Sequence, residues 1–84
     1  MKVHELKIHS DFFKATVDGA RKFEVVKLSD NIRLGDQLIL RENTIQGITD
    51  RYCIAKVTFI QPCYSAILQG YTIVSYMLLN VFNL

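Results

Sequence analysis

Apolar and polar side chains alternate at a period of two residues along much of this chain, a pattern typical of β-strands with one buried face. With β-branched and aromatic enrichment, this alternation predicts strands at residues 3–9, 22–28, 37–42, 51–61 and 71–78. A chain of 84 residues suffices for one domain. Mostly antiparallel strands in so short a chain favour a closed or nearly closed barrel, because closure removes exposed edges. We expect one mainly β (α+β) domain spanning residues 1–84.

Helical spacing follows the first strand. Ser10 offers an N-cap, Asp11 places a negative charge in the first turn, and Gly19 ends the pattern after two to three turns. The apolar stripe of this helix consists of Phe12, Phe13, Thr16 and Val17. A second, short helical segment or turn is expected at residues 64–69, before the last strand.

Glu24 is the candidate functional residue that the strand pattern singles out, because it falls on the more apolar face of residues 22–28. A carboxylate facing the inside of a barrel needs a cation or several donors, a wet cleft, or a raised pKa. Lys7 and Arg41 are the favoured partners, since neighbouring strands can bring them across the face; Arg21 and Lys22 are the alternatives. Glu24 could equally form a purely structural ion pair between the strand and the helix end.

The distribution of charge divides the chain. The net charge is only +2, too low to indicate nucleic-acid binding by itself, so any anion-binding surface must be local. Residues 1–51 hold all the charged side chains except Lys56. The favoured interpretation is that the last strands are central and buried on both faces. The alternative is a subunit contact through residues 76–84, YMLLNVFNL.

Composition also limits cofactors and location. Cys53 and Cys63 lack metal-ligand spacing with His4 and His9, which face opposite sides of one strand, so buried free thiols and no metal or cofactor are expected. The apolar C-terminal stretch is too short for a membrane helix and no leader opens the chain, so we expect a cytoplasmic protein that does not bind membranes.

Three blocks of sequence carry a resemblance: HELKIHSDFFKATVDGARKFEVVK, then LGDQLILRE, then GYTIVSY. In order and spacing they resemble the ASCH family of the PUA-like superfamily, and within it the short bacterial and phage DUF3850-like subgroup that opens with His-Glu-Leu-Lys. The resemblance spans nearly the whole chain. It implies a β-barrel of five to six strands with a helix after the first strand. It also implies RNA or other nucleic-acid binding, since relatives include activating-signal-cointegrator-like coactivators, ribonucleases and amidohydrolases acting on modified nucleosides.

The hallmark of that family is a glycine, a lysine two residues later, a glutamate three beyond and an arginine two beyond that. Gly19 and Glu24 match it, whereas Arg21 replaces the lysine and Val26 replaces the arginine. Amidohydrolase-like relatives use that lysine, but arginine keeps its proton and cannot act as a base, so this chemistry is disfavoured. No catalytic residue is assigned; an enzyme would have to use Glu24 and Lys22.

The favoured hypothesis is a nucleic-acid-binding module with a basic cleft around residues 19–27. In it, Glu24 accepts hydrogen bonds from a base or sugar edge, and Tyr52 is the candidate for base stacking. The residues expected to contact phosphates or orient Glu24 are Lys7, Arg21, Lys22, Lys27 and Arg41. A small hydrolase acting on RNA or a modified nucleoside is the second hypothesis, and a homodimeric interaction protein using the C-terminal strand is the third. Gly35 and Asp36 are interpreted as turn residues.

Overall fold

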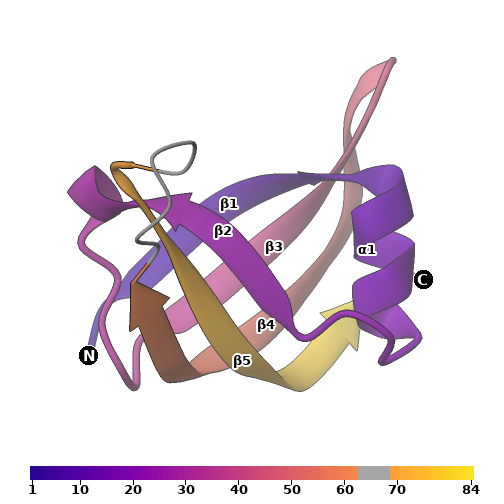
Figure 1. The fold of residues 1–84 in the computed structure, drawn as a ribbon. Helices are drawn as coiled ribbons and strands as arrows, with labels where there is room; N and C mark the ends of the chain where they lie inside the picture. The colour runs from indigo at the N-terminus through magenta and orange to yellow at the C-terminus, as the bar shows by residue number, and fades with distance from the viewer. Residues whose placement is uncertain (63–68) are drawn as a thin grey trace.

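The fold was analysed in a computed structural model, which describes residues 1–62 and 69–84. Five strands and one α-helix make up this part of the chain (Figure 1). Their bounds are β1 Val3–His9, α1 Ser10–Val17, β2 Phe23–Lys27, β3 Gln37–Thr44, β4 Gly47–Pro62 and β5 Tyr71–Phe82, with a 3₁₀ turn, η1, at Leu28–Asp30. The mainly β prediction and the helix after the first strand are confirmed. The predicted helical segment at residues 64–69 lies almost entirely outside the described residues.

The strands form one sheet in the order β1-β3-β4-β5-β2. β1 runs parallel to β3, and every other neighbouring pair is antiparallel. The sheet curls into a half-barrel, so that its two edge strands, β1 and β2, approach each other without pairing (Figure 1). The barrel is therefore open along one side, and that open side is where the candidate site lies.

Helix α1 packs against one end of the half-barrel (Figure 1). Its N-cap is His9, not Ser10 as predicted, because β1 stays extended through His9 and the helix begins at Ser10; the Asp11 amide donates to His9 Nδ1 at 3.2 Å. The apolar stripe predicted for this helix is also too wide. Phe13 is buried, at 2% exposed, but Phe12 is 50% exposed and does not belong to the buried face. Gly19 follows the helix with a φ of +81°, the left-handed conformation that ends helices.

The core fills the concave side of the sheet. Leu38 and Leu40 on β3 pair with Ala55 and Cys53 on β4, and all four are fully buried. The convex side has no covering layer among the described elements, so the prediction that the last strands are buried on both faces is wrong: Phe59 is 59% exposed and Met77 on β5 is 53% exposed. Cys53 is a buried free thiol as predicted, while Cys63 lies outside the described residues.

Candidate functional site

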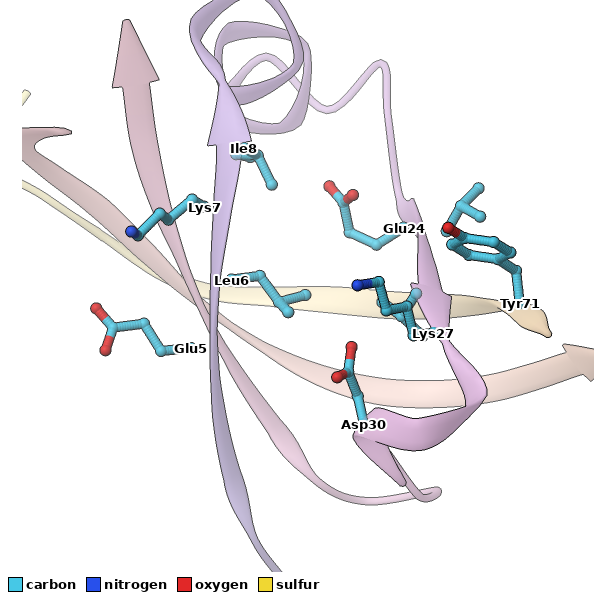
Figure 2. Close-up of a pocket in the computed structure, with 10 residues that line it drawn as sticks. Glu5, Leu6, Lys7, Ile8, Glu24, Lys27, Asp30 and Tyr71 are labelled. Carbon is cyan, nitrogen blue, oxygen red and sulfur yellow. The ribbon is translucent and has the colours of Figure 1, made fainter. Parts of the chain in front are cut away.

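A groove of about 450 Å³ lies between the two edge strands (Figure 2). It exists because β1 and β2 approach each other without exchanging backbone hydrogen bonds. Its volume is in the range of small-molecule and cofactor pockets. Ten residues line it: Glu5, Leu6, Lys7, Ile8, Glu24, Val25, Val26, Lys27, Asp30 and Tyr71.

The alternation along β1 decides which of its side chains enter the groove. Leu6 and Ile8 point toward β2, whereas Glu5 and Lys7 point away to the convex side (Figure 2). Lys7 therefore borders the groove through its backbone and does not direct its ammonium group toward Glu24, contrary to the favoured pairing. From the other wall, Lys27 reaches toward β1 at the end of β2.

Glu24 is the buried carboxylate of this groove. It is 6% exposed, and its side chain points from β2 toward Ile8 (Figure 2). Its Oε1 accepts a hydrogen bond from Arg21. Burial raises the pKa of Glu24, and the hydrogen bond and charge of Arg21 partly offset this increase. The partner is therefore one of the alternatives named from the sequence, not Lys7 or Arg41.

Arg21 is held in place by aromatic rings and by the turn that carries it. Its guanidinium carbon lies 4.5 Å from the ring centroid of Phe12 and 4.8 Å from that of Phe23. The Tyr76 hydroxyl donates to the Arg21 carbonyl at 3.2 Å, and the Tyr76 amide donates to the Lys22 carbonyl at 3.0 Å. These contacts fix the segment between α1 and β2, so that a side chain three residues before Glu24 reaches it.

The interior behind Glu24 is polar as well as apolar. The hydroxyls of Thr16 and Tyr76 hydrogen-bond at 2.7 Å, and burial raises the pKa of Tyr76. Burial, with a smaller contribution from the negative charge of Glu24, raises the pKa of Cys53 to about 11. Cys53 is therefore a structural thiol, protonated at neutral pH.

Arg41 and Tyr52 lie on the convex side of the sheet, away from the groove. Arg41 hydrogen-bonds Glu5, and its guanidinium carbon lies 5.2 Å from the Tyr52 ring centroid. Phe82, on the strand at the other side of β4, stacks on the same ring with centroids 4.7 Å apart. Both faces of the Tyr52 ring are thus used within the protein. Lys22 is exposed and borders a separate cavity beside Tyr76.

Asp36 is more than the turn residue expected from the sequence. It is buried, its Oδ2 lies 2.7 Å from His4 Nε2, and it accepts the backbone amides of Lys2 and Arg33, each at 3.0 Å. These hydrogen bonds hold the pKa of Asp36 well below its usual range. The carboxylate links the start of β1 to the loop before β3. The sequence around Asp36 indicates a turn, but it does not show that the side chain makes these contacts.

Glu42 is a buried carboxylate that the sequence interpretation missed. Its Oε1 accepts Nε of Arg51 at 2.7 Å, Nη2 of Arg51 at 2.6 Å and the Thr49 hydroxyl at 3.0 Å. The residue borders a second cavity, beside α1. The period-two pattern could have identified it, because Glu42 continues the inward-facing series of Leu38 and Leu40 along β3.

Two further properties follow from the described part of the chain. Among residues 1–62 and 69–84, no three His, Cys, Asp or Glu side chains gather closely enough to hold a metal ion. The same residues include no helix with the length and apolar character needed to cross a membrane.

Residues 3–76 match the family described as "Domain of unknown function (DUF3850)". The chain is also similar to a protein of Escherichia phage P2 described as "Uncharacterized 12.9 kDa protein in GpA 3'region". The two are 38% identical over 58 residues, which cover 68% of this chain and 52% of the phage protein, so the chain spans about half the length of that relative. Because the family model matches most of the chain, including β1, β2 and the groove between them, the chain belongs to the DUF3850 family.

Proposed function

We propose that this domain binds single-stranded RNA in the groove between β1 and β2. The observation that carries the proposal is a buried carboxylate, Glu24, at the wall of an open groove that also presents the ammonium group of Lys27. Single-stranded nucleic acid offers both partners for such a pair, since its unpaired bases carry hydrogen-bond donors and its backbone carries phosphates.

We also propose that DUF3850 domains are ASCH-like members of the PUA-like superfamily. The half-barrel with a helix after its first strand agrees with what that resemblance implies, and Gly19 and Glu24 occupy hallmark positions. The ion pair of Arg21 with Glu24 gives the replaced lysine position an orienting function. Because arginine retains its proton, we favour a binding module over a hydrolase.

The roles of the groove residues differ in this proposal. Lys27 contacts a phosphate, Glu24 accepts hydrogen bonds from a base or sugar edge, and Arg21 fixes the orientation of Glu24. Lys7, Lys22 and Arg41 point to other surfaces and contribute only a general positive potential. The groove itself is thus predicted to make few phosphate contacts and to bind weakly at physiological salt.

Fluorescence anisotropy with a labelled single-stranded RNA across a salt series tests the proposal. We expect binding whose logarithm falls linearly with the logarithm of salt concentration, by about 0.7 per phosphate contacted. Lys27→Ala should reduce affinity and flatten the slope, whereas Lys56→Ala, an exposed lysine on β4, should act as a matched control. Absence of binding at low salt, or equal effects of the two variants, would contradict the proposal.

A second candidate function, a homodimer formed through β5, is favoured by one observation. The convex face exposes Met77 and Leu79 on this strand, together with Phe59 on β4. Such apolar surface is a common mark of protein contacts. Sedimentation at micromolar concentrations should show a dimer that Met77→Glu disrupts; a monomeric wild type excludes this candidate.

A further inference from the structure

The carboxylate of Glu24 lies at the wall of the groove, where the residue is 6% exposed. Its Oε1 accepts from Arg21, and no residue within 1–62 or 69–84 donates to Oε2. Figure 2 shows the carboxylate directed into the groove from β2. An acceptor held in this way favours a ligand that brings donors.

The surroundings of this oxygen suit a flat, largely apolar ring. Leu6 and Ile8 from β1 and Val26 from β2 form the apolar part of the groove, while Lys27 supplies a cation from the end of β2. Arg21 keeps the carboxylate in one orientation, since the guanidinium is itself packed between Phe12 and Phe23. The groove thus presents an oriented acceptor and a separate cationic donor beside apolar walls, and a second carboxylate, Asp30, also lines it.

We infer that the groove selects guanine among the bases of a single strand. This inference rests on the proposed function. The Watson–Crick edge of guanine carries two adjacent donors, N1–H and the N2 amino group, next to the O6 acceptor. The two donors match a carboxylate, which leaves the ammonium group of Lys27 for the phosphate.

The other bases present a poorer match to the same groups. Adenine and cytosine each offer one amino group beside ring acceptors, which face the carboxylate unfavourably. Uracil places its single donor between two carbonyl acceptors. Because a site built around a buried polar group discriminates against ligands that leave it unpaired, the predicted order is guanine first and uracil last.

Removing a single amino group from the central base of an RNA probe tests this inference. The probes are short oligouridines that carry guanosine, inosine, adenosine or cytidine at the central position, with all-uridine as reference. Inosine differs from guanosine only by the absence of the N2 amino group. The wild-type chain should bind the guanosine probe about 5-fold to 100-fold more tightly than the inosine probe, the range for one bidentate base contact.

Two protein variants test whether Glu24 causes the preference for guanosine. Glu24→Gln replaces one acceptor by a donor and should bring the guanosine-to-inosine ratio close to one, whereas Glu5→Gln, on the opposite face of β1, should leave it unchanged. Because both probes are measured on the same variant, partial loss of folded protein cancels from the ratio. Equal wild-type affinity for all five probes would overturn the guanine inference and leave RNA binding standing. No binding of any probe would overturn both.

Discussion

The Arg21–Glu24 pair sets the character of the groove, because Glu24 lies where water cannot fully solvate it. Removing the cation leaves a buried carboxylate with a raised pKa. Arg21→Ala should therefore lower the free energy of unfolding by about 3 kcal/mol, near the lower end for broken buried pairs, in urea denaturation. Arg33→Ala, which removes an exposed guanidinium, is the control and should change stability by less than about 0.5 kcal/mol.

A double-mutant cycle distinguishes an ion pair from simple packing at this position. If the two charges interact as the structure indicates, Arg21→Ala combined with Glu24→Gln should be less destabilised than the sum of the single variants, by about 0.5–3 kcal/mol. Purely additive effects would mean that Arg21 stabilises the fold through Phe12 and Phe23 alone.

Asp36 makes the stability of the domain sensitive to acid. Its pKa is lowered in the folded state, so the folded carboxylate resists protonation and the unfolded chain binds the proton first. Asp36 therefore adds to the free energy of unfolding at pH values above 3.8, the ordinary pKa of an aspartate. This stabilisation is lost as the pH falls below that value. The difference in urea midpoint between wild type and Asp36→Asn should shrink from pH 6 to pH 3. A constant difference would contradict this assignment; Asp30→Asn is the exposed control.

Sequence reasoning at the residue scale placed Glu24 correctly but favoured Lys7 or Arg41 as its partner over Arg21. The period-two pattern placed Glu24 inward, as observed, because backbone pleating fixes the face of every residue on a strand. The pairing with Arg21 depends on how the turn after Gly19 folds back and on cation–π contacts of the guanidinium with two aromatic rings. Such contacts between loop and strand have no periodic signal.

At the scale of elements, helix α1 is attached mainly through one of two adjacent phenylalanines. Phe13 is fully buried, whereas Phe12 lies over Arg21 with half its surface exposed. Phe13→Ala should cost about 3–5 kcal/mol and Phe12→Ala about 1 kcal/mol or less, measured by thermal or urea unfolding. Equal losses would mean that the helix packs differently from the arrangement in Figure 1.

Strand existence was predictable, whereas strand neighbours were not. The bounds of β1 agree with residues 3–9, and β2 lies within the predicted 22–28, because alternation reports the face that each residue takes. It carries no information on which strand lies alongside. The parallel pairing of β1 with β3, and hence the placement of β1 and β2 at opposite edges, required the structure.

At the scale of the whole molecule, the open side of the half-barrel is the property from which the proposed function follows. Buried carboxylates occur at separate places around the sheet, at Glu24, Asp36 and Glu42, and each has a cationic or histidine partner. Those of Asp36 and Glu42 accept several hydrogen bonds within the protein. The carboxylate of Glu24 lies in the groove between the edge strands, which makes it the candidate for ligand contact.

An amide chemical-shift map of the isotope-labelled chain, titrated with a single-stranded RNA, locates the RNA-binding surface. Shifts should concentrate on Leu6 to Ile8 of β1 and Glu24 to Lys27 of β2, the two walls of the groove. Amides beside Arg41 and Tyr52 on the convex face should move little. Shifts centred on the convex face, or none at saturating RNA, would contradict the claim that the open side of the half-barrel is the binding site.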